Sequence, residues 1–369
     1  MFLVMFMSIY IHIPFCSSIC TYCDFCKIIY NRKYIDDYLD NLEKEIRLRY
    51  KKENVKSIYI GGGTPSCLDD NELIKLFNIV KLFNVDENSE FTMECNVESI
   101  TEEKLKIMSN YGVNRISIGV ESFNDDIIKK LGRHHNKKMV FDKINLVKKY
   151  FNNINIDLIY AAYDDINILK DDIMSFLQLN IEHISTYSLI LEDNTMLKIN
   201  GMENINEDVD YDMYKYIEST LESNGYIHYE ISNYAKDGYM SFHNLVYWNN
   251  MEYYGFGLSS VSYIDNRRIF NTKNLFKYLN GIYLDRSEYE DKNIRMENEV
   301  MLGLRKTKGI CLKDFEEKYN IKFDDVFSIY ELVKDKYLII DNGYIRINKE
   351  YMYISNEIIV RMFKWCYNY

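Results

Sequence analysis

The chain has 369 residues, with little proline, little tryptophan and no excess of positive charge. It contains two prolines, two tryptophans and six histidines, and its formal net charge is −11. This charge argues against a nucleic-acid partner, because nucleic-acid-binding surfaces are normally basic. Short basic pairs such as Lys51-Lys52 are followed by acidic residues and are typical of solvated charge. Both prolines, Pro14 and Pro65, fall inside motifs described below.

The sequence also lacks a hydrophobic run long enough for a membrane helix. Residues 1–14 are apolar, but the run is short of the roughly 20 residues that a span needs. It has no basic start and no small-residue cleavage site, as a signal peptide would. The alternation from Ser8 to Ile13 instead predicts a buried first strand. We therefore expect a cytoplasmic protein without a transmembrane segment, in which a tight cysteine cluster favours a metal site over disulfides.

Short β-branched runs alternate with amphipathic helical stretches from Ser8 to about Tyr234. The predicted strands are Ile9–Ile13, Ser57–Ile60, Glu90–Cys95, Arg115–Ile118, Ile154–Ile159 and His183–Leu189. The predicted helices are Lys33–Tyr50, Asn71–Phe83, Glu102–Tyr111, Asn136–Phe151, Leu169–Leu179 and Asp208–Asn224. Six strand–helix units predict an α/β fold with a partial (β/α)6, TIM-like barrel. In such barrels the chemistry collects at the carboxyl ends of the strands.

The alternation stops after about Ser262, which suggests a division into parts. We expect a barrel at residues 1–262, a polar connector at 263–294 and a small C-terminal domain at 295–369. The last part reads as helices Glu297–Arg305, Leu312–Tyr319 and Asp324–Lys334, then a hairpin of Tyr337–Ile340 and Tyr344–Ile347. Three helices with a β-wing resemble a winged helix. Given the acidic charge, we prefer a packing or partner-binding domain to a DNA-binding one.

Three cysteines, Cys16, Cys20 and Cys23, follow the first predicted strand in a Cys-x3-Cys-x2-Cys loop. Three thiolates on one loop can bind three irons of a [4Fe–4S] cluster and leave the fourth iron open to a small molecule. Cys26 keeps a four-cysteine zinc site open as an alternative, although zinc loops usually bring two well-separated pairs of ligands. Unliganded thiols are a third alternative. We expect the cluster, with Cys26 as a nearby free thiol.

The segment from Tyr10, which reads Tyr-Ile-His-Ile-Pro-Phe-Cys, precedes the cysteine loop, and Asp24-Phe25 follows it. Together they resemble the signature of radical S-adenosylmethionine (SAM) proteins of the oxygen-independent coproporphyrinogen III oxidase group. That group includes the HemW-type haem chaperones. The resemblance covers nearly the whole chain. It implies a radical SAM barrel whose three cysteines hold a [4Fe–4S] cluster, with SAM as a second cofactor.

A glycine-rich segment, Gly-Gly-Gly-Thr-Pro-Ser from Gly61 to Ser66, follows the second predicted strand. Its glycines would let the backbone approach a ligand without an intervening Cβ, and no Lys-Ser/Thr follows as in a phosphate-binding loop. The resemblance implies that this segment binds the methionyl group of SAM. It also suggests Arg133 for the methionyl carboxylate. The SAM contacts implied in this way are Tyr10, Tyr22, Gly62, Gly63, Thr64, Glu94, Glu121, Arg133 and Asp157.

The chain departs from the family pattern at three positions in this region. Glu121 stands where a glutamine is usual, so a carboxylate replaces a neutral amide. Residues 161–163 read Ala-Ala-Tyr instead of Gly-Leu-Pro, and Val97 replaces a proline after Asn96. These changes leave the expectation of cluster binding untouched, but they weaken the expectation that SAM is cleaved.

The rare residues His243 and Trp248 share the pattern His-Asn-x-x-Tyr-Trp. An imidazole beside aromatic rings suits haem, although a histidine in such surroundings is more often a core residue. The pattern resembles the segment associated with haem binding in HemW-type proteins, which implies haem contacts for His243, Tyr247 and Trp248. The short stretch before Cys16 and the lack of a Cys-x-Cys arrangement favour the chaperone branch over the oxidase branch.

The resemblance therefore implies a haem chaperone that binds haem, a [4Fe–4S] cluster and SAM, and passes haem to an acceptor protein. A flavodoxin- or ferredoxin-type protein is a candidate reductant, and a membrane-associated acceptor is compatible with a chain that lacks a transmembrane segment. The alternative is a radical SAM enzyme, similar to the oxygen-independent oxidase, that generates a 5′-deoxyadenosyl radical. A family member with a purely structural cluster is a third hypothesis. We assign no catalytic residue.

Overall fold

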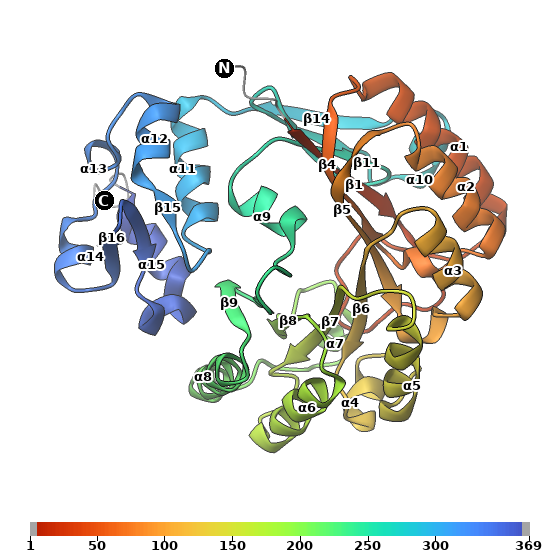
Figure 1. Ribbon diagram of the computed structural model, residues 1–369, viewed down its shortest axis with the longest axis horizontal. Helices are drawn as coiled ribbons and strands as arrows, with labels where there is room; N and C mark the ends of the chain where they lie inside the picture. The colour runs from red at the N-terminus through yellow and green to blue at the C-terminus, as the bar shows by residue number, and fades with distance from the viewer. Residues whose placement is uncertain (1–5, 364–369) are drawn as a thin grey trace.

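The computed structural model describes residues 6–363, which are built around one 12-stranded sheet and a small second domain (Figure 1). Six strands run parallel in the order of the chain: β1 (Phe6–Ile13), β4 (Asn54–Gly62), β5 (Asn84–Asn96), β6 (Arg115–Glu121), β7 (Ile154–Tyr160) and β8 (His183–Ser188). The helices between them are α1 (Arg32–Arg49), α2 (Asp70–Val80), α3 (Glu102–Asn110), α4 (Asp125–Lys130), α5 (Lys137–Val147) and α6 (Ile166–Leu179). Figure 1 shows these helices along the outer side of the curved sheet, so the predicted partial barrel is confirmed.

Alternating side chains explain why these strands form a barrel wall. On β1 the side chains of Ile9, Ile11 and Ile13 are fully buried toward the helices. The apolar face of α1, which includes Leu39 and Leu42, is buried as well. The burial of these apolar faces stabilises the fold, and it leaves the opposite face of each strand for polar residues.

The sheet continues at both edges with strands that the sequence did not predict. After β8 come α7 (Met196–Ile199), α8 (Glu207–Ser223) and the antiparallel strands β9 (Ile227–Glu230) and β10 (Asn233–Ala235). The helix α9 (Phe242–Trp248) follows, and β11 (Tyr253–Phe256) pairs parallel with β1. The edge is then extended by β12 (Val261–Ile264), β13 (Arg267–Asn271) and β14 (Leu284–Tyr289), with α10 (Leu275–Leu279) between the last two.

Residues 263–294, which we expected to connect two domains, are thus folded onto the barrel. The buried carboxylate of Glu45 on α1 links these residues to the barrel. It accepts hydrogen bonds from Asn271 on β13 (2.7 Å) and Tyr278 on α10 (2.7 Å), and forms an ion pair with Arg49 (2.5 Å). The predicted domain boundaries themselves stay a prediction.

The C-terminal region has its own hydrophobic core. Its elements are α11 (Lys292–Gly303), β15 (Ile310–Cys311), α12 (Leu312–Tyr319), α13 (Phe323–Val326), α14 (Tyr330–Lys334), β16 (Leu338–Asp341), β17 (Tyr344–Ile347) and α15 (Ser355–Met362). The predicted single helix Asp324–Lys334 is wrong, because Phe327 is extended and pairs with Phe363, which splits it into α13 and α14. The predicted hairpin is present as β16 and β17, and β15 adds a third strand.

Within residues 6–363, no helix combines the length and the apolar character that a membrane span requires.

We expect the Glu45 contacts to be important for stability. Replacing Glu45 with alanine leaves Arg49 without its buried partner, and the free energy of unfolding should fall by about 3 kcal/mol. Urea denaturation followed by circular dichroism measures this. The matched control is Glu43→Ala, since the Glu43–Arg47 pair lies on the same helix but is exposed, and exposed pairs contribute little. Equal losses in the two variants would contradict the role given to Glu45.

Candidate functional site

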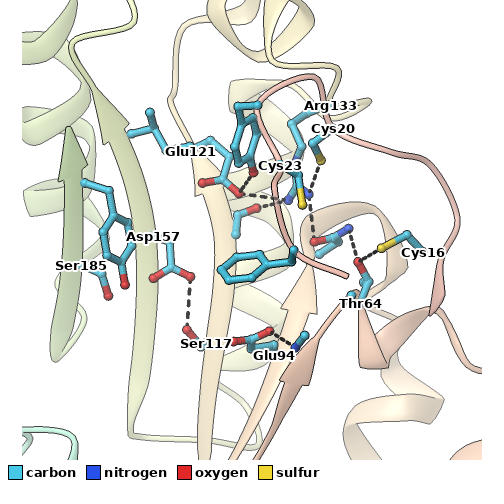
Figure 2. A pocket seen from close by; sticks show the side chains of 18 of the residues that line it. Cys16, Cys20, Cys23, Thr64, Glu94, Ser117, Glu121, Arg133, Asp157 and Ser185 are labelled. Atoms are coloured by element: carbon cyan, nitrogen blue, oxygen red, sulfur yellow. Dashed lines mark hydrogen bonds and ion pairs between the residues drawn. The ribbon is translucent and has the colours of Figure 1, made fainter. Parts of the chain in front are cut away.

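A cavity of about 480 Å³ opens at the carboxyl ends of the parallel strands (Figure 2). Most of the residues predicted to bind cofactors line it. They are Cys16, Cys20, Tyr22, Cys23, Gly62, Gly63, Thr64, Glu94, Glu121, Arg133 and Asp157. The cavity therefore brings together side chains from the cysteine loop, from the turn after β4 and from the ends of β5, β6 and β7.

The cysteine loop is held between two short paired strands, β2 (Phe15–Cys16) and β3 (Ile28–Ile29). Two of its sulfurs face hydrogen-bond donors: the Cys16 Sγ lies 3.6 Å from Thr64 Oγ1, and the Cys20 Sγ lies 3.6 Å from Arg133 Nη1. Burial raises the pKa of the Cys16 thiol to about 11 and also raises the pKa of Cys20. A positive iron centre would favour the thiolates, and the two donors would stabilise them. This donor set fits a cluster bound at one side of the cavity.

Cys26 differs from the other three cysteines. Among the described residues that line the cavity, Cys26 is absent, and its backbone carbonyl accepts a hydrogen bond from the His12 ring (2.9 Å). No three histidine, cysteine or acidic side chains within residues 6–363 are placed to bind a single metal ion.

The glycine turn packs directly against the strand that leads into the cysteine loop. A Cβ on Gly62 would lie 2.4 Å from the His12 ring, and a Cβ on Gly63 would lie 2.7 Å from the Pro14 carbonyl carbon. Gly62 also has a φ of +109°, which favours glycine. We expected these glycines to make room for a ligand. The structure shows that they first make room for β1, so the turn and the cysteine loop are fixed to each other.

Two carboxylates line the cavity from β5 and β7, which lie on either side of β6. Glu94 accepts hydrogen bonds from Tyr59 Oη (2.7 Å) and from the Gly62 backbone N–H (3.1 Å), and burial raises its pKa to about 7. Burial also raises the pKa of Asp157, which accepts from Asn155 (2.9 Å) and Ser117 (3.3 Å). Such buried acceptors suit the hydroxyl or ammonium groups of a polar ligand.

The unusual carboxylate of Glu121 is accommodated by contacts within the protein. It accepts a hydrogen bond from Tyr22 Oη (2.8 Å) and lies 3.7 Å from the Arg133 guanidinium, although burial raises its pKa. Arg133 also donates to Asn96 Oδ1 (2.9 Å) and to the Gly119 carbonyl. Among residues 6–363, no group accepts from the buried Nε of Arg133. Arg133 therefore keeps one donor for an anionic ligand group.

Tyr10 is the one predicted SAM residue that does not line the cavity. Its hydroxyl lies 3.0 Å from His12 Nδ1, and its ring stacks on Tyr59 with the centroids 6.2 Å apart. Tyr59 does line the cavity. Tyr10 therefore reaches the cavity only indirectly, through its contact with Tyr59.

The predicted haem residues lie on α9, and none of the three lines this cavity, although Asn244 of the same helix does. The His243 side chain is 1% exposed, and both ring nitrogens are in hydrogen bonds: Nδ1 with Ser57 (2.9 Å) and Nε2 with Tyr247 (2.9 Å). Burial lowers its pKa to about 3. An iron ligated by His243 would have to replace one of these bonds. In this conformation His243 does not fit as a haem ligand, and Trp248 lies under the Arg305 guanidinium, 5.8 Å from its ring centroid.

Several polar side chains that line the same cavity were not predicted from the sequence. They are Tyr59, Asn96, Arg115, Ser117, Asn155 and Ser185. The signal was present, because these residues alternate with buried aliphatic ones along predicted strands. The period-2 pattern of such polar residues marks the inner face of the barrel.

Comparison with known proteins links this geometry to two family models. The model of the radical SAM superfamily matches residues 10–171, and the model of the HemN C-terminal domain matches residues 291–351. The first includes the cysteine loop and most of the cavity wall. The second covers most of the C-terminal region with its own core.

Curated proteins named "Heme chaperone HemW" are similar over most of the chain. The one from Lactococcus lactis subsp. lactis (strain IL1403) is 38% identical over 363 residues, which are 95% of this chain and 96% of the relative. The one from Bacillus subtilis (strain 168) is 36% identical over 95% of each chain. The one from Escherichia coli (strain K12) is 32% identical over 76% of this chain and 77% of the relative.

Among solved structures, coproporphyrinogen III oxidase (HemN) from Escherichia coli has a similar fold. The TM-score is 0.85, with 21% sequence identity, over 98% of this chain and 91% of that chain. At this identity the similarity shows the architecture alone, and it agrees with the partial barrel and the added C-terminal domain.

The raised pKa of Glu94 predicts a pH-dependent stability. The folded protein disfavours the ionised carboxylate. The resulting loss in the free energy of unfolding is therefore absent below the ordinary pKa near 4.5 and complete above about 7. The SAM-free protein should lose at most roughly 3 kcal/mol from this group between pH 4.5 and pH 8. Urea denaturation at a series of pH values measures this loss.

In Glu94→Gln the loss should shrink, because an amide does not ionise. The control is Glu103→Gln, an exposed carboxylate on α3 whose replacement should keep the wild-type pH dependence. If Glu94→Gln follows the wild-type curve, Glu94 is not the group that titrates.

Proposed function

This chain belongs to the HemW family of the radical SAM superfamily, and we propose that it is a haem chaperone, which binds haem as cargo and passes it to an acceptor protein. The observation that carries this proposal is the similarity to named haem chaperones over 95% of the chain. The C-terminal region supports it, because it matches the HemN C-terminal domain that accompanies the barrel in this group.

Radical SAM membership implies a [4Fe–4S] cluster and SAM, and we propose where this chain holds them. Cys16, Cys20 and Cys23 would ligate the cluster, with Thr64 and Arg133 donating toward its sulfur ligands. When bound, the cluster supplies an electron-transfer centre and an iron with an open ligand position. What supports this assignment is that all three thiols line one cavity, two of them beside donors.

The remaining wall of the cavity suits SAM. Its carboxylate would pair with Arg133, which keeps its Nε donor without an acceptor among the described residues. Glu94 and Asp157 would accept from the ammonium and ribose hydroxyl groups. The other side chains and backbone groups that we propose around SAM are Tyr22, Gly62, Gly63, Thr64 and Glu121. Tyr10 would support this wall through its contact with Tyr59.

Haem binding needs a different account, because the buried His243 does not offer a ring nitrogen to iron in this conformation. The proposed role of the His-Asn-x-x-Tyr-Trp segment is to form α9, which lies between the barrel and the C-terminal domain (Figure 1) and is joined to the barrel by the bond between His243 and Ser57. Trp248 would help to hold the end of the same helix, because its ring lies against the Arg305 guanidinium.

The partners follow from this function. We propose a haem-acceptor protein and, for the cluster, a reductant of the flavodoxin or ferredoxin type. The cytoplasm is the proposed location, since free thiols in a cluster loop require a reducing compartment.

The cluster assignment is tested by single replacements. We expect Cys16→Ala, Cys20→Ala and Cys23→Ala each to lose most of the iron, sulfide and visible absorption of the anaerobically reconstituted protein, because a missing thiolate leaves an iron unheld. The control is Cys26→Ala, in the same loop, which should keep them. Full iron content in any one of the first three variants would contradict the assignment.

The chaperone function predicts saturable haem binding and transfer. The reconstituted protein should bind haem with a new Soret absorption band and deliver it to a haem-free b-type cytochrome faster than haem-loaded albumin does. Stopped-flow spectroscopy measures the transfer. If the protein binds no haem at saturation, the proposed function is wrong.

A further inference from the structure

Two segments at and beside the cysteine loop carry only positive charge, in a chain whose formal net charge is −11. Residues 25–35 run from the cysteine loop into α1 and contain two lysines, one arginine and no acidic residue. Residues 266–284 include β13 and α10 and contain two lysines, two arginines and no acidic residue. Because the chain as a whole is acidic, this local excess of positive charge is a candidate surface for a charged partner.

The two segments lie against each other in the folded chain. The rings of Tyr34 on α1 and Phe276 on α10 are in contact, with their centroids 6.0 Å apart, and Figure 1 shows α10 beside α1. Lys27 and Lys273 both lie near the Cys26 thiol: burial raises the pKa of this thiol, and the charges of the two lysines oppose the rise. We call the combined surface the basic patch, and it consists of Lys27, Lys33, Lys273 and Lys277 with the rings of Phe25 and Phe276.

The basic patch combines exposed charge with exposed aromatic rings. Lys33, Lys273 and Lys277 are exposed. Phe25 is 71% exposed and Phe276 is 61% exposed. Protein interfaces are enriched in aromatic residues and have polar rims, so this composition suits a protein partner.

The acidic side chains around the basic patch leave its positive charge in excess. Asp24 and Asp37 adjoin it in the sequence. Asp36 and Asp40 of α1 are paired with Lys75, which lies outside the patch (3.1 and 2.7 Å). The charge therefore favours a partner with an acidic surface.

One edge of the basic patch belongs to the candidate cluster site. Phe25 and Lys27 line the main cavity, and Lys27 donates a hydrogen bond to the backbone carbonyl of Cys23, one of the three proposed cluster ligands. A protein docked on the patch would therefore lie beside the cluster. Electron transfer requires this proximity, because its rate falls steeply with the distance between donor and acceptor.

We propose that the basic patch is the docking surface for a small acidic protein that carries one electron to the cluster. This inference rests on the proposed cluster and names where the reductant binds. The carrier is oxidised by one electron, and the cluster is reduced by the same electron. With a flavodoxin, the anionic hydroquinone becomes the neutral semiquinone, so no proton moves and no bond forms or breaks. An anionic lipid surface would also suit basic and aromatic side chains, but only an electron carrier has to lie beside the cluster.

The test is the reduction of the cluster in the anaerobically reconstituted full chain by flavodoxin hydroquinone, followed by stopped-flow absorption. Lys273→Glu/Lys277→Glu should be reduced roughly tenfold more slowly than the wild type at low salt, because the charge that steers the carrier is reversed. The difference should shrink as salt is raised. Calorimetric titration with oxidised flavodoxin should show weaker binding. Photoreduced 5-deazariboflavin, a small uncharged reductant, should reduce both proteins at the same rate.

Matched controls lie far from the cysteine loop in the sequence. Lys138→Glu/Lys313→Glu makes the same change in net charge at exposed positions of α5 and α12, and it should be reduced as fast as the wild type. Phe276→Ala should weaken flavodoxin binding at every salt concentration, since an apolar contact is lost. Tyr330→Ala removes an exposed ring on α14 and should not.

Two results would overturn the inference. If flavodoxin reduces Lys273→Glu/Lys277→Glu as fast as the wild type, the basic patch is not the docking surface. If that variant instead loses binding to vesicles that contain phosphatidylglycerol, with flavodoxin reduction unchanged, the patch binds lipid. Neither result touches haem binding and transfer, which test the chaperone function separately. A chain that is reduced through the patch but binds no haem would contradict the chaperone function and support the docking surface.

Discussion

Charge buried at the carboxyl ends of the parallel strands is the constraint on which the candidate site depends. Glu94, Glu121 and Asp157 all line one cavity, and burial raises the pKa of each. A buried carboxylate without partners would be costly, so each has donors from the neighbouring strands or from Arg133. Burial also raises the pKa of the Cys16 and Cys20 thiols, and a bound positive centre would favour their thiolates. The site is therefore arranged for cationic and polar ligands before any of them binds.

The sequence was sufficient for the barrel and for the cysteine loop, the glycine turn and the charged residues of the cavity described above. The predicted strands coincide with β1, β4, β5, β6, β7 and β8, because each is a buried strand whose aliphatic run is hard to mistake. The cysteine loop and the glycine turn were recognised from local spacing, and the register that pairs Ile13 with Gly62 brings them together. Local spacing did not reveal the reason for the glycines. It lies in contacts with His12 at the end of β1 and with Pro14 just after it, about fifty residues earlier in the chain.

The failures of the sequence reading have a common physical cause in long-range contacts. Residues 263–294 are polar, and their role as a connector stays a prediction, but their sequence gives no sign that Asn271 and Tyr278 donate to the buried Glu45 carboxylate on α1. The helix expected at Asp324–Lys334 is split because Phe327 is extended and pairs with Phe363. In both cases a tertiary contact outweighs a local preference that was weak to begin with.

His243 shows the same effect at a functional motif. A histidine among aromatic residues was interpreted as a haem ligand, and the resemblance to a haem-binding segment favoured that interpretation. In the structure the ring fills a buried space beside Tyr59, and both nitrogens are satisfied by Ser57 and Tyr247. His243 lies next to Asn244, which lines the main cavity. A buried residue of α9 can therefore position a residue of the cavity wall through its bond to Ser57, without touching a ligand itself.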